Sequence, residues 1–153
     1  MSLRSEISLP RDPLDALLLA IGLRFYDLSK RSAEFQELLR LRNFTLQIAS
    51  KDGSTRCFIV SDGHFHQSAV AAEHPDLALT FASSMLGVKL ITRSDPAALI
   101  NAIQSGELES KGDFALLLWF AQAGSHLGLG SDLEKLGLKE PLDQLKRLKR
   151  RFF

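Results

Sequence analysis

The chain has 153 residues, of which 45% are hydrophobic and 24% charged, and its formal net charge is +1 at pH 7. This composition is typical of one globular domain, and the single cysteine, Cys57, excludes a disulfide framework or a multi-cysteine zinc site within the chain. No run of about 18 apolar residues is present and the N-terminal segment lacks the apolar centre of a secretory signal, so we expect a soluble, cytoplasmic protein.

The first part of the chain is expected to be helical. Asp12 and Pro13 are a typical N-cap and first helical residue, and apolar residues then recur at helical spacing as far as Leu28. Ser32 can cap a second, shorter helix. We therefore predict an N-terminal helical extension over residues 1–32.

The apolar period then changes from that of a helix to that of a strand. Asp62 and Gly63 are typical of a hairpin turn between two of these strands. Four strands are predicted, and we expect them to form a meander. Their approximate ranges are 44–48, 56–61, 64–70 and 77–81.

Helices return after the fourth strand. Ser83 can cap a short helix, Asp95 and Pro96 can begin another, and Gly106 is a typical residue at its end. Residues 107–112 follow as a short strand, and its single apolar side chain favours an edge position in the sheet.

Asp113 separates this polar strand from the apolar segment "FALLLWF". An aspartate that precedes a run of helix formers is typical of an N-cap, which stabilises a helix by about 1 kcal/mol, and we prefer this interpretation to a catalytic carboxylate. The helix that follows, residues 114–124, is apolar on nearly all sides. We expect it to be buried almost all round or to face a ligand.

The order of these elements resembles the sterol carrier protein type 2 family, over residues 33–127. The most specific parts are "HPDLALTF", similar to the start of that family's fourth strand, and "GELESKGD", similar to its Gly-Asp turn. The resemblance implies an α+β fold: a five-stranded, largely antiparallel sheet with helices packed on one face, enclosing an apolar cavity. Family members accept fatty acyl chains, sterols or prenyl-quinones there, and bacterial relatives include accessory proteins of ubiquinone biosynthesis.

A ligand-binding set follows from this resemblance, made of residues on the helix-facing side of the strands and the inward faces of the later helices. The same side chains would equally fill a closed core, so the sequence leaves open whether a cavity exists. The predicted lining residues are Phe65, Leu77, Leu79, Phe81, Met85, Leu86, Leu90, Leu99, Ile103, Leu117, Leu118 and Phe120.

The function expected from the resemblance is the non-catalytic binding or transfer of a fatty acyl lipid, phospholipid or prenyl-quinone, without a cofactor. The alternative is an accessory or scaffold domain with a filled core that binds protein partners, for example in ubiquinone biosynthesis. The sequence contains no nucleophile elbow, no phosphate-binding glycine loop and no metalloprotease motif, so we do not expect an enzyme.

A glycine-containing linker and a basic amphipathic helix are predicted over residues 128–153. Without the five cations of the last eight residues, the charge of +1 becomes −4, which is not the footprint of a nucleic-acid-binding protein. Apolar and basic residues alternate here as in helices that lie on membranes. We therefore expect this segment to dock on an anionic membrane, such as the inner membrane surface, or on a protein. The alternative is a solvated tail. The predicted docking residues are Lys146, Arg147, Lys149, Arg150, Arg151 and Phe152.

A metal site is the remaining alternative. His64 and His66 fall on the same face of the third predicted strand, a spacing that suits two metal ligands. A third ligand would have to come from a distant residue such as His74 or His126. Because the sequence defines no third ligand, we prefer exposed strand polarity and predict no metal.

Overall fold

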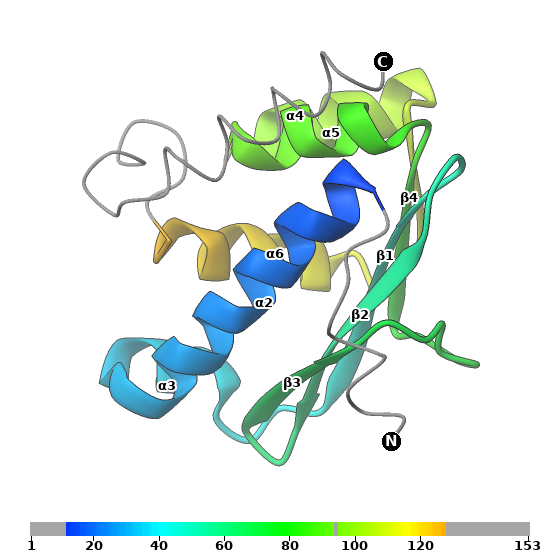
Figure 1. Ribbon diagram of the computed structural model, residues 1–153. Helices are drawn as coiled ribbons and strands as arrows, with labels where there is room; N and C mark the ends of the chain where they lie inside the picture. The colour runs from blue at the N-terminus through cyan, green and yellow to red at the C-terminus, as the bar shows by residue number, and fades with distance from the viewer. Residues whose placement is uncertain (1–11, 94, 128–153) are drawn as a thin grey trace.

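The computed structural model describes residues 12–93 and 95–127, which form five helices and one five-stranded sheet (Figure 1). The helices are α2 (Pro13–Arg31), α3 (Ala33–Leu39), α4 (Ser84–Thr92), α5 (Pro96–Ser105) and α6 (Ala115–Ser125). The strands are β1 (Phe44–Ser50), β2 (Thr55–Ser61), β3 (His64–Ser68), β4 (Leu77–Phe81) and β5 (Leu108–Gly112). The helices lie on one side of the sheet, so the predicted α+β fold class is confirmed.

The sheet is largely antiparallel, with the strand order β3-β2-β1-β4-β5. β1, β2 and β3 form an antiparallel meander, and β2 turns into β3 through Asp62 and Gly63, whose φ angles are 51° and 77°. β4 does not continue this meander. It crosses to the other side of β1 and pairs with it in parallel, with Leu46 opposite Leu77. The predicted four-strand meander is therefore wrong in its last strand, because alternation identifies a strand but not its partner.

Side-chain caps fix where four of the helices begin, as the sequence predicted. In each case a side-chain oxygen of the cap residue accepts a hydrogen bond from a first-turn amide at 2.9–3.1 Å, and the cap residues are Asp12, Ser32, Ser83 and Asp95. Gly106 ends α5 in the left-handed conformation, with a φ of 85°.

The start of α6 differs from the prediction. The helix begins at Ala115 and Asp113 lies two residues earlier, so Asp113 is not the N-cap, although its Oδ1 accepts the amide of Ala115 at 3.0 Å. The helix is also not buried all round, because Phe114, just before its first turn, is 44% exposed and Leu118 is 52% exposed. Both side chains point away from the core in spite of their apolar character.

α2 lies across the helix-covered face of the sheet (Figure 1). Its apolar stripe packs in the same buried cluster as the apolar residues of the strands, so α2 is part of the hydrophobic core. The buried members of the stripe are Leu14, Leu17, Leu18, Ile21 and Phe25. None of the helices in the described part of the chain is long and apolar enough to span a bilayer.

Candidate functional site

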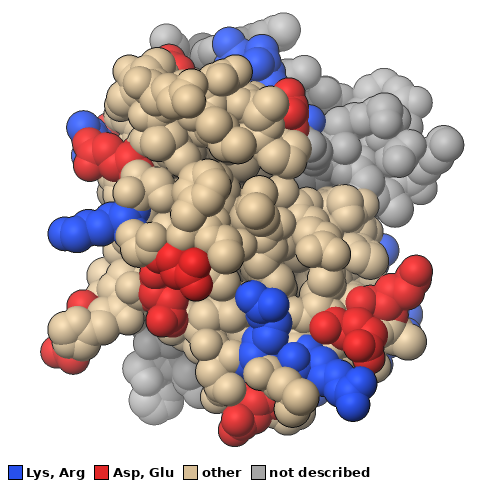
Figure 2. Space-filling model, turned by 180° about the vertical axis from the view of Figure 1, so that it is seen from behind, with Lys and Arg blue, Asp and Glu red and all other residues tan. Residues whose placement is uncertain are grey.

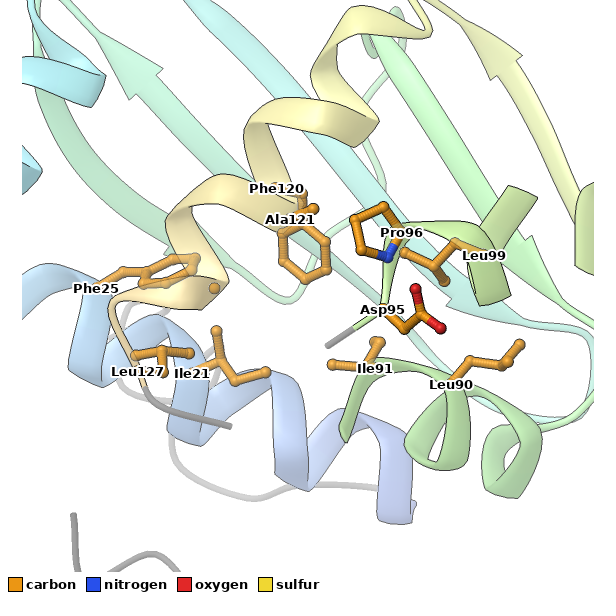
Figure 3. Close-up of a pocket in the computed structure, with 11 residues that line it drawn as sticks. Ile21, Phe25, Leu90, Ile91, Asp95, Pro96, Leu99, Phe120, Ala121 and Leu127 are labelled. Carbon is orange, nitrogen blue, oxygen red and sulfur yellow. The ribbon is translucent and has the colours of Figure 1, made fainter. Parts of the chain in front are cut away.

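An apolar pocket lies where α2, α4, α5 and α6 approach one another (Figure 3). Asp95, at the beginning of α5, is the one lining residue with a charged side chain, and it is exposed. The lining residues are Ile21, Phe25, Leu90, Ile91, Asp95, Pro96, Leu99, Phe120, Ala121, Gly124 and Leu127. The pocket therefore offers almost no hydrogen-bonding groups and suits an apolar occupant.

The pocket is nearly closed. Its cavity volume is about 20 Å³, which is enough for about one water molecule, whereas sites for small organic ligands hold on the order of 300–1,000 Å³. The space between the helices and the sheet is thus a packed core with a narrow pocket. A lipid chain fits only if the helices separate.

Two aromatic side chains, Phe25 and Phe120, line the pocket, and they belong to a larger aromatic cluster. Phe25 is fully buried, and the rings of five other residues have centroids 5.2–6.5 Å from its own, all in tilted or edge-to-face geometry. These residues are Phe35, Phe58, Phe65, Trp119 and Phe120.

Two small residues of α6, Ala121 and Gly124, also line the pocket, and Ala121 lies beside Phe120 (Figure 3). Gly124 faces open space, since a Cβ atom built there would meet nothing within 4 Å, and Ala121 lies one turn earlier. Enlargement of the pocket is therefore expected beside Ala121 and Gly124 and not beside the packed aromatic rings.

The structure places the predicted lining residues in three groups. Leu90, Leu99 and Phe120 line the pocket. A second group lies in the buried core or packs partly buried near it, and consists of Phe65, Leu77, Leu79, Phe81, Leu86, Ile103, Leu117 and Met85. Leu118 is a correction: it is 52% exposed, because it lies on the outer side of α6.

The prediction missed the contribution of α2. Ile21 and Phe25 line the pocket, and both belong to the helical apolar stripe that the sequence displays. That signal was available, but the family resemblance began at residue 33 and so left α2 out of the ligand-binding set.

A buried ion pair near the start of α2 was also missed. The guanidinium of Arg56 donates to both carboxylate oxygens of Asp15, at 2.7 and 3.3 Å, and to the Oε1 atom of Gln67 at 3.1 Å. Gln67 in turn lies directly against Gly22, where a Cβ atom would be 2.6 Å from the amide group. These contacts join α2 to β2 and β3, and none of the four residues lines the pocket.

The histidines and the cysteine do not assemble into a chemical site. His64 and His66 are exposed on β3, on either side of the buried Phe65. Within residues 12–93 and 95–127, no three His, Cys, Asp or Glu side chains are placed to hold a metal, and this includes His74 and His126. Cys57 is buried, and burial raises the pKa of its thiol. The predicted docking residues, Lys146 to Phe152, lie outside the described residues.

The two sequence comparisons found no relatives: no protein-family model matches the chain, and no curated protein matches it. Solved structures do match. A protein described as "UbiJ-SCP2 Ubiquinone synthesis protein" is 20% identical, with a TM-score of 0.57, over 75% of this chain and 93% of that one.

Two further solved structures that match are described as sterol carrier proteins. Sterol carrier protein 2 from Yarrowia lipolytica, in the apo form, is 13% identical with a TM-score of 0.54, over 71% of this chain and 88% of that one. The sterol carrier protein domain 2 of Helicoverpa armigera is 17% identical with a TM-score of 0.52, over 72% and 89%. With its mixed five-stranded sheet covered by helices, the chain has the sterol carrier protein type 2 fold.

Proposed function

We propose that this protein binds a hydrophobic ligand without catalysis, and that the ligand enters between α2, α4, α5 and α6. The observation that carries the proposal is the apolar pocket at this junction, which is lined by the aromatic rings of Phe25 and Phe120 and by the small residues Ala121 and Gly124. The likeness to sterol carrier protein structures supports it by analogy of fold. The ligand classes that fit are a fatty acyl lipid, a phospholipid or a prenyl-quinone.

The narrow volume means that binding includes a rearrangement. Burial of a chain of about sixteen methylenes releases roughly 13 kcal/mol, at about 0.8 kcal/mol each. Association costs about 4–15 kcal/mol, and separation of the packed helices adds to this. Affinity from water is therefore moderate. Transfer from a bilayer gains almost nothing, because lipid tails are already out of water, so loading at a membrane surface is favoured.

The first test is native mass spectrometry of the freshly purified protein, followed by solvent extraction and lipid analysis. The proposal predicts a bound mass that extracts as a lipid or quinone. Delipidated protein is then titrated with a fluorescent fatty acid. Protein with no adduct and no binding of the fatty acid contradicts the proposal.

A variant of the pocket makes the test specific. G124L adds a large side chain to a residue that lines the pocket, and we expect it to weaken fatty acid binding at least about tenfold while it stabilises α6 by replacing glycine. Q122L adds the same side chain to an exposed position of the same helix and is the matched control. Equal binding by G124L and Q122L would show that the ligand does not use this pocket.

The alternative is an accessory domain whose surface binds protein partners. The observation that favours it is the small cavity volume of about 20 Å³, which is that of a filled core. The likeness to a structure described as a ubiquinone synthesis protein is consistent with such a role. A stable protein partner that co-purifies with lipid-free protein, together with no effect of G124L on that partner, would support this alternative.

A further inference from the structure

The mouth of the apolar pocket lies at the start of α5. Of the lining residues, only Asp95 and Pro96 are exposed, and the others are buried or half-buried. The buried lining side chains are all apolar, so they offer no hydrogen bond to a polar group. A lipid whose chain fills the pocket therefore keeps its polar head group at this mouth, where the side chains decide which head groups are accepted.

The start of α5 has no free amide for an anionic head group. A helix usually favours an anion at this end, because its first amides are unpaired and its dipole is positive there. In α5, Asp95 binds these amides itself. Its side chain accepts the amide of Ala97 at 3.0 Å, and its carbonyl oxygen accepts those of Ala98 and Leu99 at 3.0 and 3.3 Å. Pro96 has no amide hydrogen, so the first turn has no donor left for a carboxylate or phosphate.

Asp95 also places a negative charge at the mouth. Figure 3 shows its carboxylate among the lining side chains of α4 and α5. The Oδ1 atom is used by the helix cap, whereas Oδ2 makes no hydrogen bond or ion pair with another residue of the described part of the chain. Oδ2 can therefore accept a hydrogen bond from a ligand, and it repels an anionic group beside it.

The basic side chains of the surrounding elements do not line the pocket. Lys89 of α4 and Arg93, which follows that helix, are exposed and lie outside the set of lining residues. Arg24 of α2 is paired with Asp27, with 3.2 Å between Nη1 and Oδ2. Among the described residues, Asp95 is thus the one charged side chain that lines the pocket.

The helices α5 and α6 add no charge of either sign. Neither α5, with the sequence "PAALINAIQS", nor α6, with "ALLLWFAQAGS", contains Lys, Arg, Asp or Glu. Seen from behind, the molecule has a broad uncharged surface with charged side chains at its margins (Figure 2). The charge that a head group meets is therefore set by the segment between α4 and α5, where Asp95 lines the pocket and Arg93 does not.

We propose that Asp95 is a specificity-determining residue, which favours an uncharged head group with a hydroxyl, as in a long-chain alcohol or phenol, over the anionic head group of a fatty acid. The hydroxyl donates a hydrogen bond to the carboxylate, whereas an ionised acid has only acceptors and carries a charge of the same sign. Because Asp95 is exposed, water screens the repulsion, and we expect it to weaken binding of the acid about three- to tenfold. The inference rests on the proposed function, since it concerns the same pocket.

Paired probes test this selection. A pyrene-labelled fatty acid and the alcohol with the same chain and label are titrated into delipidated protein at pH 8, at concentrations where both probes are monomeric. The measured quantity is the ratio of the two dissociation constants, acid over alcohol. D95N keeps a good N-cap but removes the charge. We expect the ratio to fall about three- to tenfold in D95N, mainly through tighter binding of the acid, and to fall in the wild type when salt is added.

Two further variants separate the possible outcomes. D62N is the matched control, because Asp62 is an exposed aspartate that does not line the pocket, and it is expected to keep the wild-type ratio. R93Q tests the opposite interpretation, in which the mouth attracts anions through Arg93. An unchanged ratio in D95N, or a loss of acid binding in R93Q that exceeds the gain in D95N, overturns the inference but leaves the proposed function in place. If neither probe binds the wild type or D95N, the proposed function fails and the inference fails with it.

Discussion

The guanidinium of Arg56 and the carboxylate of Asp15 meet inside the core, with 2.7 Å between Nε and Oδ1, where the two residues are 1% and 3% exposed. Asp15 lies in the first turn of α2 and Arg56 on β2, so one ion pair fixes the start of the helix against the sheet. Two charges this far from water are stable only together, because each offsets the desolvation of the other.

Loss of one partner of this pair is therefore expected to be severe. R56M leaves the buried carboxylate of Asp15 without its guanidinium, and we expect it to reduce the free energy of unfolding by about 3–5 kcal/mol. The double variant R56M/D15L should recover most of this loss. Urea denaturation followed by circular dichroism measures both values.

An exposed ion pair is the control for that measurement. Lys51 and Glu109 are 2.8 Å apart but more than half exposed, so K51M should change the free energy of unfolding by less than about 1 kcal/mol. A loss in R56M no larger than that in K51M would mean that the buried pair does not hold α2 in place.

The second glycine of the segment "GELESKGD", Gly112, is predicted to be essential for packing and not for chemistry. Gly112 has a φ of 121° and is paired with Leu77, and a Cβ atom there would collide with the carbonyl oxygen of Asp76. That oxygen accepts the amide of Asp113 at 2.8 Å. The two sequence segments that carry the family resemblance are therefore neighbours in the fold.

A pair of alanine variants isolates this effect. G106A also puts alanine at a positive φ, of 85°, but its Cβ would meet nothing within 4 Å, so we expect a loss of about 1 kcal/mol from the backbone alone. G112A adds the steric collision and should lose clearly more, at least about 3 kcal/mol. Similar midpoints of urea denaturation for the two variants would contradict the close approach.

Local features of this fold could be predicted from the sequence. Hairpin residues such as Asp62 and Gly63, and caps such as Ser32 and Ser83, act through hydrogen bonds or φ angles within a few residues. The short distance in sequence is the reason that they were found.

Features that depend on distant partners could not be predicted. Arg56 directly precedes the apolar run Cys57–Val60 in β2, and its partner is 41 residues away. The parallel pairing of β4 with β1 likewise depends on which strand is the most stable neighbour for β4. The alternation of apolar and polar residues shows which segments are strands but not which strands pair.

The candidate site was predictable in kind but not in detail. Leu90, Leu99 and Phe120 were found because apolar residues on these helices must face the sheet or one another. The outward position of Leu118 and the narrowness of the pocket depend on how side-chain volumes fill a particular space, which a pattern of apolar residues does not contain.

Cys57 is predicted to be unreactive in the folded protein. It is 1% exposed, burial raises the pKa of its thiol, and its Sγ atom lies 3.5 Å from the carbonyl oxygen of Val70. Because the thiolate is the reactive form, alkylation at pH 8 should proceed only as fast as the protein opens, and should become rapid in denaturant. Mass spectrometry of iodoacetamide-treated samples measures the rate. Labelling of the native protein at the rate of the denatured protein would show that β2 is accessible.

Asp12 is predicted to make the protein sensitive to acid. Burial raises the pKa of this carboxyl, but hydrogen bonds from Asp15, Ser54 and Ser84 together lower it further, so that it lies below the ordinary value of 3.8. A group with a lowered folded pKa stabilises the protein fully above its unfolded pKa, and this contribution is lost as the pH falls through the folded pKa. The free energy of unfolding should therefore decline as the pH drops below about 4.

D12N tests this directly, because asparagine keeps an acceptor at the N-cap but cannot ionise. We expect it to be about 1–3 kcal/mol less stable than the wild type at pH 7, where charged hydrogen bonds are lost, and to approach the wild type at the lowest pH. D27N is the control. The hydrogen bond from Arg31 lowers the pKa of Asp27, but the pair lies on the surface, where water screens it. The free energy of unfolding of D27N should therefore follow that of the wild type closely at every pH. Urea denaturation at a series of pH values gives the three curves. A constant difference between D12N and the wild type at every pH would assign the role of Asp12 to its shape alone and not to its charge.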